Sequence, residues 1–139
     1  MSKLHEAAKA GVDVYPSGMA ADGFSVASYL PEWRYEGANY DTICEHNSHL
    51  IIFSLEIAPD GHITALDRIP RDELMKNARV AADKHGTKLL ICFGGNARSQ
   101  GFSPMVAKAS SRKKFLAELE ALCEKYGFDG VDYNWEYPG

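Results

Sequence analysis

Short runs of apolar residues alternate along the chain with stretches in which apolar residues recur every third or fourth position. The first pattern is typical of buried strands and the second of helices that cover one face of a sheet. Four runs are predicted to be strands: residues 24–30, 49–55, 88–93 and 128–135. Three stretches are predicted to be helices: residues 40–46, 71–85 and 111–126. This alternation predicts an α/β fold built of right-handed parallel βα units.

Proline, glycine and serine residues mark the expected ends of these elements. Pro31 is expected to stop the first strand, because proline cannot donate a ladder hydrogen bond. Gly86 and Gly127 are expected to end the two long helices, and Ser111 to cap the start of the last one. These boundaries leave open whether the parallel sheet is an open one or part of a barrel.

The fourth predicted strand is the most polar of the four. Because side chains alternate between the faces of a strand, Asp132, Asn134 and Glu136 are expected on one face, with Val131, Tyr133 and Trp135 on the other. Active sites of α/β proteins lie at the carboxyl ends of parallel strands, so this polar row is a candidate catalytic site. The alternative is an edge strand whose acidic side chains only face water.

Length and composition narrow the choice of function. The chain has 139 residues, 45% of them hydrophobic and 24% charged, which fits one folded domain and excludes a disordered chain. Residues 1–22 are interpreted as a lead-in segment with a short helix at residues 3–10, and residues 23–139 as the domain. The net charge of −4 argues against nucleic acid and anionic membranes as partners. No stretch approaches the ~20 apolar residues that cross a bilayer.

Cysteine and histidine usage favours neither disulfides nor metal. Cys44, Cys92 and Cys123 lie in or beside apolar runs and are expected to be free thiols. Free thiols, together with the lack of an apolar signal peptide at the start of the sequence, predict a cytoplasmic protein. A secreted protein whose signal peptide has been removed is the alternative. The histidines are scattered, so no metal site is expected. The segment after Gly94 and Gly95 lacks the spacing of a phosphate-binding loop, so no cofactor is expected either.

Two motifs resemble those of the family-18 glycoside hydrolases, the chitinases and their relatives. The family signature Asp-x-x-Asp-x-Asp-x-Glu is matched by Asp129, Asp132 and Glu136, with Asn134 in the third acidic place. The family's Ser-x-Gly-Gly motif resembles the segment that begins at Cys92 and ends with two glycines. The resemblance covers residues 24–139 and implies the first half, strands one to four, of a TIM (β/α)8 barrel.

The resemblance also implies roles for individual residues in a retaining, substrate-assisted hydrolysis of β-1,4-N-acetylglucosaminide bonds. Glu136 would be the general acid, Asn134 would orient the acetamido group of the substrate, and Asp132 would lie buried beneath it. Asp129 would be structural, and Cys92 replaces the serine of the family. Six residues are assigned to the substrate site: Tyr29, Trp33, Phe53, Gly94, Gly95 and Tyr137. Tyr29 and Phe53 are expected nearer the core and Trp33 nearer the sugar.

Asn134 and the length of the chain leave three interpretations open. The first is a chitinase-like enzyme acting on chitin or N-acetylglucosamine oligosaccharides, impaired because Asn134 lacks the charge of the family's aspartate. The second is an inactive, lectin-like protein that binds the same sugars. The third is a truncated product with no function of its own. Since half a barrel leaves two sheet edges unpaired, self-association or pairing with a complementary half-barrel is expected.

Overall fold

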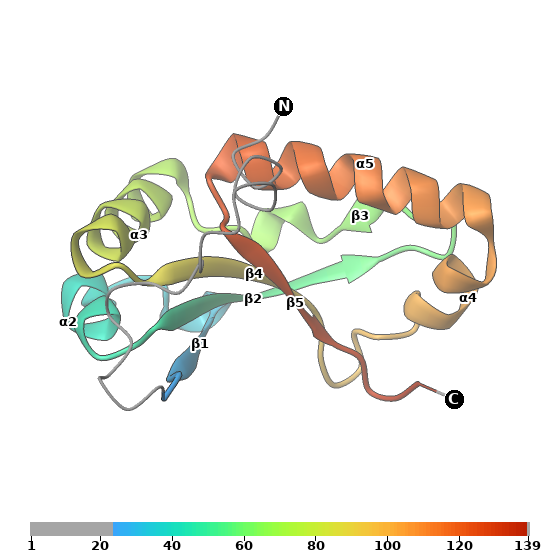
Figure 1. The fold of residues 1–139 in the computed structure, drawn as a ribbon. Helices are drawn as coiled ribbons and strands as arrows, with labels where there is room; N and C mark the ends of the chain where they lie inside the picture. The colour runs from blue at the N-terminus through green and yellow to red at the C-terminus, as the bar shows by residue number, and fades with distance from the viewer. Residues whose placement is uncertain (1–23, 139) are drawn as a thin grey trace.

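The computed structural model describes residues 24–138, so the expected helix at residues 3–10 lies outside the described residues (Figure 1). Four strands form one sheet in the order β1-β2-β4-β5, and all three pairings along this path are parallel. Their bounds are Ala27–Pro31 for β1, His49–Ile57 for β2, Lys88–Gly94 for β4 and Gly130–Asn134 for β5. The predicted parallel α/β fold is confirmed.

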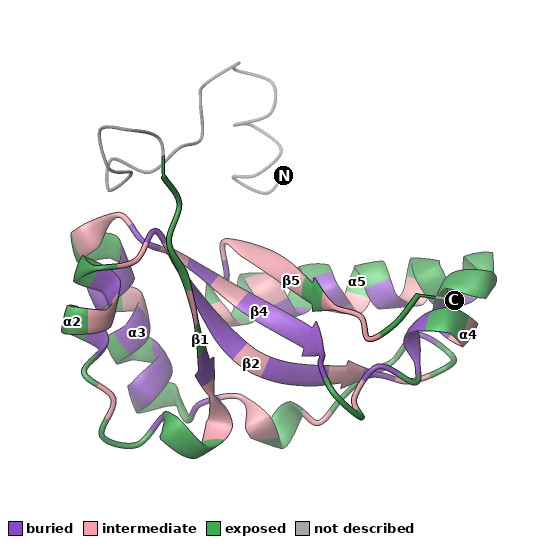
Figure 2. Cartoon of the chain, turned by 90° about the horizontal axis from the view of Figure 1, so that it is seen from below, coloured by how far each residue is buried: buried purple, intermediate pink, exposed green. Residues whose placement is uncertain are grey.

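Helices connect the strands and cover one face of the sheet. Their bounds are Tyr40–Glu45 for α2, Asp72–His85 for α3, Phe102–Ala107 for α4 and Ala109–Tyr126 for α5, with 3-10 turns η1 at Glu32–Arg34 and η2 at Leu66–Arg68. Figures 1 and 2, seen from two sides, agree that α3 and α5 lie on the same face of β2 and β4. The central strands are therefore largely buried, as Figure 2 shows. The helices leave the other face of the sheet for the functional site.

The buried face of the sheet explains why the apolar runs fold as strands. Leu50, Ile52 and Ile91 are fully buried where β2 and β4 pack under the helices. The ring of Phe93 meets that of Phe115 edge to face, with centroids 5.3 Å apart, so α5 is packed against β4. Burying each such side chain stabilises the fold by about 1.5–3 kcal/mol. Gly86 and Gly127 end α3 and α5 in the left-handed conformation, as predicted.

Several predicted boundaries were wrong. The first strand ends at Pro31, as expected, but it begins at Ala27 rather than at residue 24. The last strand is shorter than predicted and ends at Asn134. Ser111 does not cap α5: the helix begins at Ala109, directly after α4, and Lys108 is its N-cap. Ser111 is instead a buried residue of the first turn.

Two short elements were not predicted. No element was predicted at helix α4, which forms because Phe102 and Met105 are buried against the rest of the fold. The two-residue strand β3, Ile63–Thr64, pairs antiparallel with the end of β2. Among the described residues no helix is both long and apolar enough to cross a membrane. The three cysteines are free, two of them buried and one half-buried, which confirms the expectation of free thiols.

Candidate functional site

The first and last strands of the sheet come together over its open face. Tyr29 on β1 donates a hydrogen bond of 3.0 Å to the Oδ2 atom of Asp132 on β5. These strands lie at opposite edges, with β2 and β4 between them. In a flat sheet the edges would be about 14 Å apart, since neighbouring strands are separated by about 4.8 Å. The sheet is therefore strongly curved, and Asp132 on its concave face is half-buried rather than buried as the family resemblance implied.

A cavity of about 350 Å³ opens at the carboxyl ends of β1 and β5 and over the middle of β2. It is lined by Tyr29, Pro31, Trp33, Phe53 and Asn134. Trp33 is 68% exposed, so it is free to contact a ligand. Tyr29, which was expected nearer the core, is 51% exposed and meets Phe53 edge to face at 5.8 Å. The structure thus brings three of the four predicted aromatic residues, all but Tyr137, together with Asn134.

Two glycines allow the strand ends to approach each other closely. Gly94 and Gly95 have φ values of +94° and +103°, a region in which glycine is favoured. The amide of Gly95 donates a hydrogen bond of 2.7 Å to the carbonyl oxygen of Asn134. A Cβ atom on Gly95 would lie 2.7 Å from the ring of Phe53, and one on Gly94 would lie 2.3 Å from the carbonyl oxygen of Asn134. These glycines form the back of the site rather than its lining.

Glu136 follows the end of β5 and is held through its backbone. Its amide donates a hydrogen bond of 3.1 Å to the Oγ atom of Ser99, which also lies 3.0 Å from the carbonyl oxygen of Gly95. The side chain of Glu136 is half-buried and makes no hydrogen bond or ion pair with residues 24–138. Tyr137 is 84% exposed and does not line the cavity. Ser99 was missed by sequence reasoning, since a loop serine has no periodic signal.

Cys92 lies beside Asp132 in the register of β4 and β5. Burial, together with a hydrogen bond to Asp132, raises the pKa of its thiol, so Cys92 stays neutral. Burial likewise raises the pKa of Tyr29 to about 12, helped by its hydrogen bond to Asp132. Asp132 therefore faces two protonated groups, a thiol and a phenol.

Arg98, which the sequence did not single out, links three parts of the site. Its Nη2 atom donates a hydrogen bond of 2.7 Å to Glu32, and its Nη1 atom donates one of 3.0 Å to Ser54. The guanidinium also lies 5.4 Å from the centroid of the Phe53 ring. Burial opposes ionisation of Glu32, but the hydrogen bond from Arg98 prevails and lowers the pKa of Glu32. Because Glu32 precedes Trp33 in η1, Arg98 positions both aromatic walls of the cavity.

Asp129 lies at the other end of β5, away from the cavity. Its Oδ2 atom accepts hydrogen bonds of 2.8 Å from the amide of Leu89 and from Arg79. These bonds attach the start of β5 to β4 and to α3. Residues 24–138 contain no group of three or more histidine, cysteine or acidic residues that could hold a metal ion.

Comparison with known proteins matches this arrangement to one family. A family model described as glycosyl hydrolases family 18 matches residues 25–139. An endochitinase from Manduca sexta is 32% identical over 102 residues, which cover 69% of this chain and 18% of that protein. The chain thus spans less than a fifth of this relative.

Solved structures share the fold. The Ostrinia furnacalis Group IV chitinase, in complex with allosamidin, is 25% identical with a TM-score of 0.68, over 83% of this chain and 34% of that one. Human YKL-39, described as a pseudo-chitinase with retained chitooligosaccharide binding, is 24% identical with a TM-score of 0.66, over 83% of this chain and 33% of that one. The expected fold, the first half of a (β/α)8 barrel, is confirmed by these similarities.

Proposed function

Because the chain belongs to glycosyl hydrolases family 18, we propose that its cavity binds a chitooligosaccharide and that the chain acts on it as a slow, chitinase-like hydrolase. The observation behind this proposal is the position of Asn134, which lines a cavity walled by aromatic rings, two residues before Glu136. Aromatic rings offer apolar faces to a sugar, and an amide oxygen accepts a hydrogen bond from an acetamido N–H.

In the proposed reaction Glu136, as a carboxylic acid, gives its proton to the glycosidic oxygen while the bond from that oxygen to C1 breaks. The carbonyl oxygen of the substrate's own N-acetyl group bonds to C1 and forms an oxazolinium ion, as in substrate-assisted glycosidases. Water then attacks C1, the bond from C1 to the acetamido oxygen breaks and restores the N-acetyl group, and the Glu136 carboxylate accepts a proton from that water. The acid is regenerated and the configuration at C1 is retained.

Asn134 makes the proposed hydrolysis slow. The amide holds the acetamido group, but it has no charge to balance the positive charge that develops on the oxazolinium ion. Losing one comparable electrostatic contact in other enzymes costs about 3–4 kcal/mol in the barrier, or roughly 10²–10³-fold in rate. The same residue favours a second candidate function, binding of chitooligosaccharides without turnover, which is the property described for YKL-39.

Two assays on the same chain separate these functions. Chitotetraose binding is followed by tryptophan fluorescence, and turnover by hydrolysis of a fluorogenic chitobioside. We expect Trp33→Ala to weaken binding, and Glu136→Gln to abolish turnover while binding is kept. Binding without turnover in the unmodified chain supports the second candidate. Absence of both binding and turnover contradicts both functions.

We also propose that further strands cover the two edges of the sheet, supplied by a second copy of the chain or by a complementary half-barrel. Within residues 24–138, β1 pairs only with β2 and β5 pairs only with β4, so each has one free row of backbone groups. Exposed edges of this kind pair readily with other chains. Light scattering is expected to show a dimer or larger species; a stable monomer at micromolar concentration contradicts the second-copy form.

A further inference from the structure

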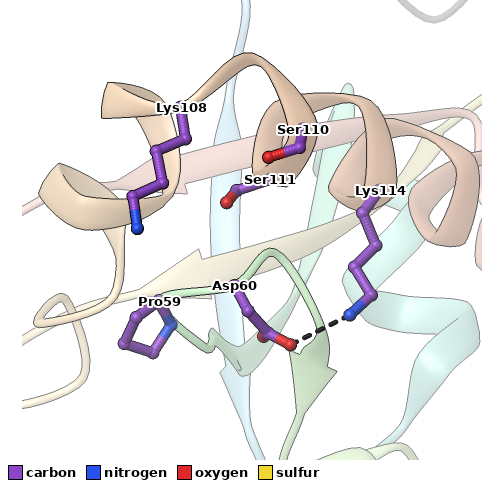
Figure 3. A pocket seen from close by; sticks show the side chains of 6 residues that line it. All are labelled: Pro59, Asp60, Lys108, Ser110, Ser111 and Lys114. Atoms are coloured by element: carbon purple, nitrogen blue, oxygen red, sulfur yellow. Dashed lines mark hydrogen bonds and ion pairs between the residues drawn. The ribbon is translucent and has the colours of Figure 1, made fainter.

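A second cavity, of about 420 Å³, lies at the start of α5 and shares no lining residue with the site described above (Figure 3). It lies between the turn after β2 and the junction of α4 with α5. Its lining residues are Pro59, Asp60, Lys108, Ser110, Ser111 and Lys114. Figure 3 shows the ammonium group of Lys108 and the hydroxyl groups of Ser110 and Ser111 directed toward a common space.

The first turn of α5 is electropositive and uncapped. No side chain caps it, and its N-cap residue is Lys108. The first turn also contains no acidic residue. The N–H groups at the start of a helix have no partner within the helix, and the helix dipole adds positive potential there. Such a terminus favours an anion, and Lys108 increases that preference.

Ser111 supplies an independent observation that points to a ligand. The residue is only 4% exposed, and it lines the cavity. Gly61 packs so tightly on it that a Cβ atom at Gly61 would lie 2.2 Å from the Ser111 carbonyl oxygen. The hydroxyl makes no hydrogen bond to any residue in the described part of the chain, and Figure 3 shows it directed into the cavity. The backbone of Ser111 is buried while its hydroxyl opens to the cavity without a protein partner, so it can donate a hydrogen bond to an acceptor placed there.

Asp60 is the one carboxylate of the lining, and its charge is already balanced. Lys114 binds it at 2.9 Å, and the amide of His62 donates a hydrogen bond of 3.2 Å to its other oxygen. Lys108, in contrast, forms no ion pair with residues 24–138. The lining therefore has one unbalanced positive charge next to an unpartnered hydroxyl. We propose that this cavity binds a tetrahedral oxyanion, a phosphate or sulfate group that is either free or attached to a sugar.

Titration of the full chain with inorganic phosphate tests the proposal, followed by the amide resonances of Ser110 and Ser111 in ¹⁵N NMR spectra. We expect saturable shifts at both amides. Lys108→Ala is expected to weaken binding about tenfold, the loss of one charge-assisted hydrogen bond. Lys113→Ala is the control: it makes the same change in net charge but lies outside the lining, and it should change the affinity less than about twofold, because salt screens exposed charges.

Two further variants are expected to change the phosphate affinity in opposite directions, which loss of folding would not do. Ser111→Ala should weaken phosphate binding, while Asp60→Asn should tighten it, because the like charge in the lining is removed. N-acetylglucosamine 6-phosphate binding more tightly than phosphate indicates a sugar-borne group, and equal affinity indicates the free anion. Absence of saturable shifts, or equal effects of Lys108→Ala and Lys113→Ala, overturns the proposal. The test does not involve Glu136, so its outcome is independent of the proposed hydrolysis.

Discussion

Arg98 and Glu32 join the loop after β4 to the turn after β1, through a hydrogen bond of 2.7 Å from Nη2 to Oε1. The same guanidinium lies over the ring of Phe53. The shape of the aromatic cavity therefore depends on an ion pair that does not line it.

Arg98→Ala is expected to lower the free energy of unfolding by about 2 kcal/mol and to weaken chitotetraose binding. The loss is smaller than for a fully buried pair, because the two side chains are 21% and 24% exposed. Urea unfolding and fluorescence titration measure the two effects. Arg71→Ala is the control, since the pair of Arg71 with Glu36 is 61% and 71% exposed and should contribute less than about 1 kcal/mol. Equal effects of the two variants would contradict the positioning role of Arg98.

Gly95→Ala is expected to cost about 2 kcal/mol of stability and to abolish sugar binding, because of its positive φ and of contact between the new Cβ atom and Phe53. Gly37→Ala separates the two causes. Gly37 also has a positive φ, of +75°, but nothing lies within 4 Å of its Cβ position. That variant should lose about 1 kcal/mol and bind sugar normally. If Gly95→Ala binds chitotetraose as well as the unmodified chain, the close approach to Phe53 does not shape the cavity.

Asn134→Asp is expected to raise the turnover of a fluorogenic chitobioside by at least about tenfold, because a carboxylate restores the charge opposite the oxazolinium ion. Binding of chitotetraose should change much less. Asn77→Asp is the control. It makes the same change in net charge on the exposed face of α3, at a position distant in sequence from the site. An unchanged rate in Asn134→Asp would mean that this position does not limit catalysis.

Tyr29→Phe is expected to destabilise the chain by about 1 kcal/mol through loss of the hydrogen bond to Asp132. The pH dependence gives the effect a signature. Since folding raises the pKa of Tyr29 from 10.0 to about 12, its contribution is complete below pH 10 and is lost as the pH rises toward 12. The stability difference between Tyr29→Phe and the unmodified chain should shrink over that interval in urea unfolding experiments. A difference that stays constant through this range would argue against the bond.

The sheet and the positions of Asn134 and Trp33 could be predicted from the sequence, because burial imposes apolar runs and alternation on strands; the exposure of Tyr29 and the place of Tyr137 outside the cavity could not. Arg98 and Ser99 could not. They belong to a polar loop without periodicity, and their contacts depend on how Gly94 and Gly95 turn the chain. Helix α4 was missed for a similar reason: with only six residues, it is stabilised by tertiary burial rather than by a repeating pattern.

The capping role predicted for Ser111 failed because of a neighbouring element. Serine before an apolar stripe is an ordinary helix start, but here α4 ends at Ala107 and α5 begins at Ala109, with one residue between them. The helix start is thereby shifted toward the N-terminus, and the serine is buried within the first turn. The packing of two consecutive helices therefore outweighs the preference of serine for the N-cap position.

The contact between Tyr29 and Asp132 joins residues 103 positions apart in the chain. Closing so long a loop has an entropic cost that the intervening sheet and helices must offset, so we expect this contact to form among the last during folding. While the chain is being synthesised, the concave face can be completed only after residue 132 has left the ribosome. Until then the hydroxyl of Tyr29 has no partner on β5.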